Sequence, residues 1–374
     1  MSACDDETAC QFVSSRGLLK SCQVRSMNPK SSCPSQLEYI ADFIVSQNNY
    51  ARGQKDCDAP PSAPPSPVSI YVCCDAFQTF IQEYAPHINV PYVVVCGDGD
   101  LTMFREAVQP NKVNQFVMFV LNPNMRGLFS QNMDIQDCRV FLKEKITKLW
   151  NANASVFKAD NAPQSLEMAI QAAQNKLKQI PIGMDYHTIR ANPSHPWVAH
   201  SSSSTEAGMT KPVEQERILV ENIRARMNPF YQRKIRIYSN VMLCPDRFND
   251  RISAVSTIPR GLISQQTGFI PRTQTWLNML EYAFVLSPFG NGMDCHRTWE
   301  ALLCGCIPIV RSSVFNELFD GLPVLIVDRW EDISLCLLID TVAQFKEKMD
   351  NNEYNYDKLR LSYYTKMFVS KSTD

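Results

Sequence analysis

One continuous stretch, residues 281–330, constrains the fold more than any other part of the chain. It opens with the apolar run Ala283–Leu286, which is typical of a strand. Ser287–Met293 then contains two glycines, an asparagine and a proline, and Asp294 stands where a helix N-cap is preferred. The stretch therefore predicts a strand, a loop and a helix in succession.

The predicted helix has two faces of different chemistry. One face carries four apolar residues at helical spacing: Trp299, Leu302, Leu303 and Cys306. His296, Arg297 and Glu300 share another face. Because a helix N-terminus offers unpaired N–H groups and a positive dipole end, the loop before it suits a phosphate. Arg297 would reinforce an anion there, and Glu300, one turn later, would accept hydrogen bonds from ribose hydroxyls.

Two further apolar runs complete this region. Gly305 is expected to end the helix, and Ile307–Val310 and Val324–Val327 read as buried parallel strands. Strands and helices in this order predict a doubly wound α/β domain, whose ligand crevice lies at the carboxyl ends of the strands.

The residues SPFGNGMDCHRTWEALLCGCIPIV, followed by GLPVLIVDRW, resemble the donor-sugar half of exostosin-like glycosyltransferases. The resemblance implies a GT-B architecture, with two doubly wound, Rossmann-like domains facing across a cleft, and sugar transfer from a nucleotide diphosphate donor. The stretch and the arginines before it supply the expected donor-binding residues: Arg247, Arg251, Ser287, Asn291, Gly292, Asp294, His296, Arg297 and Glu300.

The length of 374 residues suits two domains. A Pro-rich linker, APPSAPPSP, ends an N-terminal extension over residues 1–67. An α/β domain on the acceptor side is predicted over 68–230 and the donor domain over 231–340. As the resemblance implies, the helices of 341–374 would cross back to the first domain. Within that domain the pattern predicts strands at 68–74, 90–97 and 115–121, and helices at 76–84, 137–150 and 163–178.

Three residues outside the donor stretch are candidates for the catalytic base. Asp100 belongs to GDGD after an apolar run, so Asp98 and Asp100 would bind a divalent cation, form a plain turn, or line the cleft as an acceptor or base site. Asp185 and His187 belong to PIGMDYHT, which resembles a segment of the same family. They would supply a general base or hold the acceptor, or His187 is a hydrogen-bonded loop residue.

Arg247 and Arg251 lie four residues apart in DRFNDR, so on a helix they would share one face. Two cations there would neutralise the departing diphosphate without a metal, and the alternative is a solvated basic face.

The composition restricts the kinds of binding partner and the cellular compartment that we expect. With 37 basic and 38 acidic residues the formal charge is −1, which favours neither nucleic acid nor an anionic membrane. An acidic N-terminus and the lack of a long apolar run predict no integral membrane segment. Several of the 14 cysteines sit in apolar runs, which suits reduced thiols. We expect a cytoplasmic protein, or one of the Golgi lumen if the natural chain carries an anchor.

The leading hypothesis is an inverting, metal-independent glycosyltransferase that uses a nucleotide sugar and no cofactor, with a glycan or glycoprotein acceptor. One alternative is a catalytically silent nucleotide- or sugar-binding protein of the same fold. The other is a metal-dependent transferase that uses Asp98 and Asp100.

Overall fold

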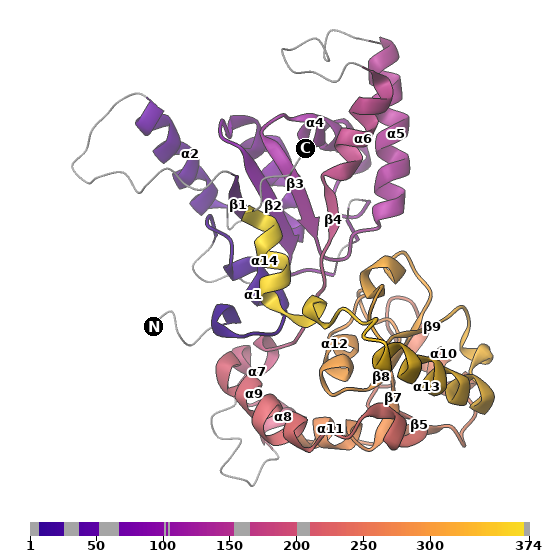
Figure 1. The fold of residues 1–374 in the computed structure, drawn as a ribbon. Helices are drawn as coiled ribbons and strands as arrows, with labels where there is room; N and C mark the ends of the chain where they lie inside the picture. The colour runs from indigo at the N-terminus through magenta and orange to yellow at the C-terminus, as the bar shows by residue number, and fades with distance from the viewer. Residues whose placement is uncertain are drawn as a thin grey trace. The chain divides into compact units, whose positions relative to one another are not determined.

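The computed structural model describes residues 7–25, 37–51, 67–100, 102–103, 105–152, 165–199 and 210–369. The chain is α/β, with two separate parallel sheets, and it divides into two compact units (Figure 1). The four-strand unit comprises Leu18–Ile180 and Tyr364–Asp374. The five-strand unit comprises Met1–Gly17 and Pro181–Tyr363.

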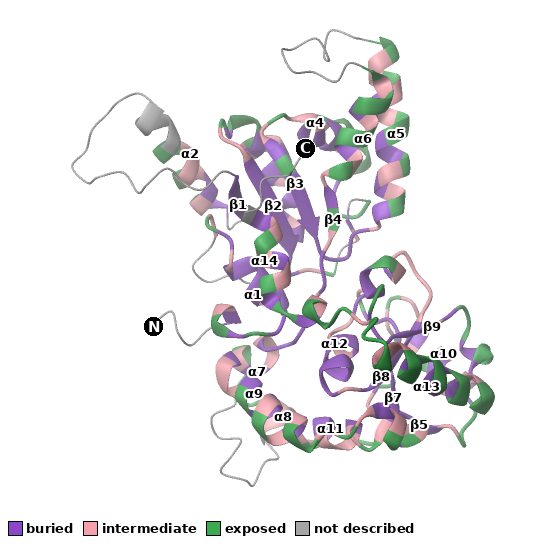
Figure 2. Cartoon of the chain, in the orientation of Figure 1, coloured by how far each residue is buried: buried purple, intermediate pink, exposed green. Residues whose placement is uncertain are grey.

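The four-strand unit is built on a sheet in the order β1-β2-β3-β4. Its strands are β1 (Val68–Cys73), β2 (Tyr92–Gly97), β3 (Met125–Ser130) and β4 (Leu177–Gln179). One row of paired residues crosses all four strands and is fully buried: Ile70, Val94, Leu128 and Leu177. Figure 2 shows how strongly burial is concentrated on the strands.

The helices of this unit are α2 (Glu38–Ala51), α3 (Phe77–Thr79), α4 (Val113–Leu121), α5 (Ile135–Ala152) and α6 (Leu166–Asn175), and α1 (Ser15–Lys20) spans the boundary between the units. The run 115–121, expected as a strand, lies in helix α4. An uninterrupted apolar run does not distinguish a buried strand from a buried helix. Here Phe116, Val117 and Val120 face inward at helical spacing, while Met118 is exposed.

The C-terminal helix α14 (Leu361–Val369) passes from one unit into the other. From Tyr364 onward it belongs to the four-strand unit, where Phe368 packs against Phe129 of β3 with ring centroids 5.0 Å apart. The helix before it, α13 (Leu335–Asp350), packs on β5 within the five-strand unit. Of the two closing helices, α13 thus belongs to the five-strand unit, and α14 belongs to the four-strand unit from Tyr364 onward.

The five-strand sheet has the order β6-β5-β7-β8-β9. Its strands are β5 (Lys234–Ser239), β6 (Ile263–Gln265), β7 (Tyr282–Leu286), β8 (Ile307–Arg311) and β9 (Leu325–Val327). Its helices, besides α13, are α7 (His187–Ala191), α8 (Pro196–Ala199), α9 (Pro212–Ile218), α10 (Asp250–Thr257), α11 (Arg272–Met279) and α12 (His296–Leu303). Ile237, Phe284 and Ile307 pair across its centre and are fully buried.

The five-strand unit is larger than the donor domain expected over 231–340. Residues 181–230, expected in the first domain, belong to it, and so do residues 7–17. The buried Glu216 carboxylate explains the association, since it accepts hydrogen bonds from the backbone N–H groups of Gln11 (2.8 Å) and Phe12 (3.1 Å) and from the Tyr186 hydroxyl (2.8 Å). Contacts between distant segments, and not chain order, set this boundary.

The two sheets also differ in winding. The five-strand order reverses between β5 and β7, which makes it doubly wound, as expected. The four described strands of the other sheet follow chain order without a reversal, so the doubly wound expectation is wrong there. Each of its crossovers places the next strand on the same side of the last one.

Three remaining expectations concern the Pro-rich linker, the cysteines and membrane-spanning segments. The Pro-rich linker falls on residues 59–67, of which 59–66 lie outside the described residues. The described cysteines are free thiols, as expected for reduced cysteines. No helix in the described ranges is both long enough and apolar enough to cross a bilayer.

Candidate functional site

The candidate site begins where the five-strand sheet reverses its order. Strand β5 ends at Ser239 and strand β7 at Leu286, and these two strands are neighbours. In parallel α/β sheets ligands bind beyond the carboxyl ends of the strands at such a reversal, because the flanking loops diverge there. The loop 287–295 follows β7 directly and leads into helix α12.

Helices on both sides hold the loop 287–295 in place. The Ser287 hydroxyl lies 2.8 Å from that of Thr298 in α12. The backbone N–H of Phe289 donates to the carboxylate of Asp250, the first residue of α10, at 2.9 Å. That buried carboxylate also accepts from the indole N–H of Trp330 (2.9 Å) and pairs with Arg311 (2.9 Å). The loop is therefore fixed by side chains that sequence reasoning missed.

Helix α12 begins at His296, and its N-cap is Cys295, which makes no side-chain cap. Asp294 was expected in the cap position and in donor contact. Instead its buried carboxylate accepts from the backbone N–H of Ile182 (2.7 Å) and from the indole N–H of Trp299 (2.8 Å). Burial raises the pKa of Asp294 to about 6. Asp294 thus joins the segment after Pro181 to α12, and the first N–H groups of α12 are left without a side-chain cap.

Two arginines lie beside this helix start. Arg297 is half-buried and donates from Nε to Oδ1 of Asn240, the residue after β5, at 2.7 Å. Arg251 lies so close to the loop that a Cβ on Gly290 would approach its Nη2 to 2.8 Å. Its buried Nε has no hydrogen-bond partner. Burial lowers the pKa of the Arg297 guanidinium, and Arg251 acts in the same direction. Neither arginine has a carboxylate partner among the described residues.

Arg247 does not share a helix face with Arg251, contrary to expectation. Helix α10 begins at Asp250, after Asn249 adopts a left-handed backbone with φ 51°. Asp246 accepts from the backbone N–H of Arg251 at 3.1 Å and so covers the start of the helix. Arg247 is exposed, and its guanidinium lies 5.1 Å from the centre of the Phe248 ring. The two arginines are four residues apart in the sequence, but Arg247 precedes the helix, because α10 begins only at Asp250.

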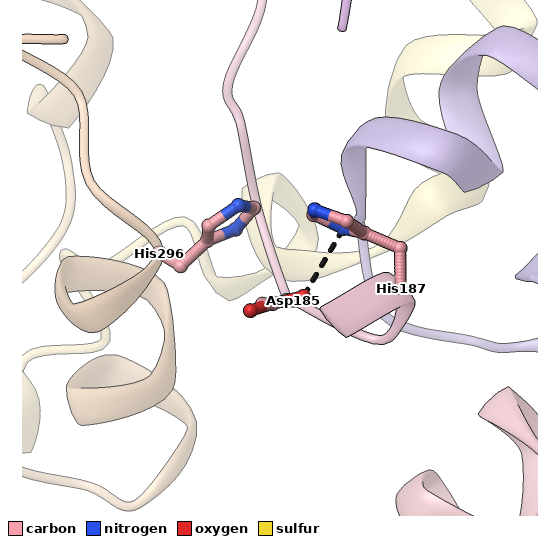
Figure 3. Close-up of side chains that lie close together, drawn as sticks. All are labelled: Asp185, His187 and His296. Carbon is pink, nitrogen blue, oxygen red and sulfur yellow. Dashed lines mark ion pairs between the residues drawn. The ribbon is translucent and has the colours of Figure 1, made fainter. Parts of the chain in front are cut away.

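On the other side of the α12 start, Asp185, His187 and His296 converge (Figure 3). Asp185 Oδ1 and His187 Nδ1 are 3.1 Å apart. His296 Nδ1 lies 2.7 Å from the carbonyl oxygen of Gly183, and the two imidazole centroids are 5.4 Å apart. His296, expected to bind the donor, therefore faces the two residues expected to act on the acceptor.

The Asp185 carboxylate is strongly positioned. Its two oxygens accept from the backbone N–H (2.9 Å) and the hydroxyl (2.6 Å) of Thr188. Burial by itself raises the pKa of Asp185, but His296, His187, Arg272 and the Thr188 bond together bring it well below its usual value. Asp185 is therefore a carboxylate throughout the neutral pH range.

Below the helix start lies a buried charged pair. Glu300 accepts from Arg272 at one oxygen and from the indole N–H of Trp276 at the other, 3.3 Å away. Arg272 is 1% exposed, and it also donates to the Gln215 amide oxygen (2.6 Å) and to the backbone carbonyl of Asp185. Both carboxylate oxygens of Glu300 thus have protein partners, and ribose binding by Glu300 stays a prediction.

The remaining expected residues differ in environment. Asn291 is exposed and Gly292 half-buried in the loop, where Gly292 accepts from the backbone N–H of Gly290 at 3.0 Å. Asp98 and Asp100 belong to the four-strand unit, whereas Asp185 and His187 belong to the five-strand unit. Asp98 is buried with φ 60°, and Asp100 is exposed.

Sequence reasoning missed Asn240, Asp250 and Arg272. Asn240 had a signal, since it follows directly on a strand that ends at the ligand edge. Arg272 had none, because it contacts residues far away in the sequence.

No family model matches the chain, and no curated protein matches it significantly. Among solved structures, the chain is similar to an alpha-glucosyltransferase in complex with UDP and a 13-mer DNA containing a HMU base. The identity is 11% and the TM-score 0.25, over 82% of this chain and 88% of that chain. A likeness at this score carries no argument about this chain, and the exclusion of nucleic acid as a partner stays a prediction.

Proposed function

We propose that this protein is a glycosyltransferase of the GT-B type that binds a nucleotide-diphosphate sugar in its five-strand unit and transfers the sugar to a glycan or glycoconjugate. One observation carries the proposal. Arg251 and Arg297 lie without carboxylate partners beside the start of α12, at the reversal of the sheet order. Two guanidinium groups without ion-pair partners among the described residues, beside N–H groups without a side-chain cap, suit a diphosphate.

The same groups suit the chemistry of transfer. As the bond from the sugar to the diphosphate breaks, negative charge develops on the leaving phosphate, and fixed cations stabilise that charge. Arginines in this role make a metal bridge to the diphosphate unnecessary. The resemblance of residues 287–310 and 321–330 to exostosin-like enzymes supports the same placement of the donor.

The proton of the acceptor hydroxyl requires a base, and His187 is the best placed of the three candidates. Its Nδ1 lies 3.1 Å from the Asp185 carboxylate, an arrangement that orients an imidazole and stabilises its protonated form. Asp185 itself is held by two bonds from Thr188, which favours a positioning role. Asp100 stays an alternative base.

Glu300 is proposed to accept hydrogen bonds from the donor ribose. It lies one helical turn, about 5.4 Å, beyond the start of α12, which matches the step from diphosphate to ribose. Although Arg272 and Trp276 occupy one position on each oxygen, a carboxylate has about four acceptor positions.

A nucleotide-binding protein without transferase activity is the second candidate. The observation that favours it is that the arginine site is complete within the five-strand unit and needs neither His187 nor Asp100. Release of free nucleotide diphosphate from a sugar donor, measured without acceptor, separates the two functions.

Isothermal titration calorimetry with a panel of nucleoside diphosphates, beginning with UDP, tests the proposed diphosphate site. Arg297→Ala and Arg251→Ala should each raise the dissociation constant up to about a hundredfold, since a charge-assisted bond contributes about 1.5–3 kcal/mol. Arg260→Ala is the matched control, because Arg260 is exposed in the connection from α10 to the start of β6, at the opposite edge of the sheet. Equal affinities in all four proteins would refute the placement of the donor.

A further inference from the structure

Asp185, His187 and His296 have the composition and spacing of a metal site. Each offers one ligand atom, and the three atoms lie within 4.8 Å of one another. In a tetrahedral zinc site with bonds near 2.1 Å, neighbouring ligand atoms are about 3.4 Å apart. The Asp185 to His187 separation of 3.1 Å is already close to that value, and the His296 ligand atom lies within 4.8 Å of both. Figure 3 shows the two rings turned toward one another beside the carboxylate.

We infer that these three residues bind one divalent cation of the zinc class. Two imidazole nitrogens and one carboxylate oxygen are a ligand set that Zn²⁺ and Co²⁺ accept, whereas Mg²⁺ and Ca²⁺ prefer oxygen alone. Three protein ligands leave a fourth position for water or a substrate hydroxyl, as in catalytic rather than structural zinc sites.

The surroundings of His296 support the inference. Its Nδ1 is engaged by the carbonyl of Gly183 at 2.7 Å, which leaves Nε2 as the nitrogen available to a cation. Metal-binding histidines commonly hold their second nitrogen in this way. Gly183 itself is closely packed, because it has φ 65° and a Cβ there would lie 2.3 Å from the carbonyl oxygen of Val13.

The Asp185 carboxylate is held in the same manner. Thr188 donates to one oxygen from its backbone N–H and to the other from its hydroxyl, so the carboxyl plane is set before any cation arrives. The His187 side chain is 24% exposed, whereas the Asp185 carboxylate beside it is buried. A cation would therefore meet ligands that are already oriented.

This inference does not rest on sugar transfer, because the site can be tested without any substrate. Bound cation and general base are alternative roles for His187, since a chain with the cation bound would not use His187 as the base. The chelator-treated full-length chain is titrated with Co²⁺ and followed by visible absorption, and Zn²⁺ is then added in competition. We expect one Co²⁺ per chain, with d–d bands of nitrogen and oxygen ligation and no sulfur charge-transfer band. His187→Ala and His296→Ala should each weaken binding at least about tenfold.

The matched control is His87→Ala, because His87 is exposed and belongs to the four-strand unit. It should bind Co²⁺ like the unaltered chain. Circular dichroism checks the fold of each variant. Absence of stoichiometric binding, a sulfur charge-transfer band, or unchanged affinity in both triad variants would overturn the inference.

Discussion

The two units differ in the polar contacts at the carboxyl ends of their strands. In the four-strand unit, amide side chains join the loops at the carboxyl edge to one another. Gln131 accepts from the backbone N–H of Asp98 at 3.1 Å, Asn132 donates to the carbonyl of Gly99 at 3.1 Å, and Gln179 donates to that of Met133 at 2.6 Å. In the five-strand unit, Arg251 and Arg297 stand at the equivalent edge without carboxylate partners among the described residues.

The difference follows from topology. Loops diverge where the strand order reverses, which leaves room for a ligand between them. Where the order runs on without reversal, successive loops are neighbours and bond to each other. Charged residues at the five-strand edge should therefore govern binding, whereas polar and charged residues of the four-strand unit should govern stability.

The largest effect is expected beneath the ligand edge. Arg272→Leu leaves the Glu300 carboxylate buried without its cation, and breaking a buried pair costs about 3–5 kcal/mol. Urea unfolding followed by tryptophan fluorescence measures the loss. Arg236→Leu, at an exposed arginine of β5, is the control and should change stability by less than about 1 kcal/mol. Similar losses in both would show that the buried pair does not support the site.

A half-buried cation of the four-strand unit should affect stability alone. The Lys176 ammonium donates to the carbonyls of Val120 (2.7 Å) and Asn122 (3.0 Å), and burial lowers its pKa to about 8. Because the folded pKa is below the unfolded value of about 10.4, the unfolded chain binds more protons between these values, so this residue makes stability rise with pH.

Between pH 8 and 10 the unaltered chain should gain about 1–2 kcal/mol relative to Lys176→Met. Urea midpoints at several pH values give this difference, and nucleotide affinity should be the same in both proteins. If the stability difference between the unaltered chain and Lys176→Met did not change from pH 8 to pH 10, the lowered pKa of Lys176 would be contradicted. A change in nucleotide affinity would contradict the division between the two units.

Glu300→Gln sharpens the comparison within the five-strand unit. The amide keeps one acceptor for Arg272 but presents a donor where the carboxylate would meet ribose hydroxyls. We expect donor affinity to fall about tenfold, since one hydrogen bond to a charged group contributes about 1.5–3 kcal/mol. Turnover at saturating donor should persist. His187→Ala should show the reverse, with low turnover and intact donor binding. A Glu300→Gln variant that binds the donor normally but is inactive would make Glu300 the base instead of a ribose-binding residue.

Much of the fold follows from local patterns in the sequence. Apolar runs such as Val68–Cys73 and Tyr282–Leu286 are strands where expected, because each is short and bounded by turn residues. The expectation of a strand at 115–121 was wrong because an uninterrupted apolar run fits a buried helix as well as a buried strand. The extent of the five-strand unit was beyond prediction, because Glu216 joins it to Gln11 across most of the chain.

The candidate site was predictable in part for the same reason. Ser287–Arg297 stands out as a loop and helix start, and Arg297 does lie there with Arg251. The partners of Asp294 and Glu300 are Ile182 and Arg272, which no spacing rule connects to them. The convergence of His296 with Asp185 and His187 likewise depends on the path of the chain after Pro181.

The smallest effect is expected at Asp98 and Asp100, which test whether the four-strand unit takes part in nucleotide binding. If the arginines hold the diphosphate, Asp100→Asn and Asp98→Asn should change the nucleotide dissociation constant by less than about twofold, which is under about 0.5 kcal/mol. A chelator should also leave nucleotide affinity unaltered, because guanidinium groups need no metal to bind phosphate. Asp98→Asn retains the left-handed backbone at φ 60°, since asparagine tolerates that conformation. A large loss of affinity in either variant, reproduced by chelation, would instead place a diphosphate-bridging cation at the four-strand edge and reverse the assignment of the two units.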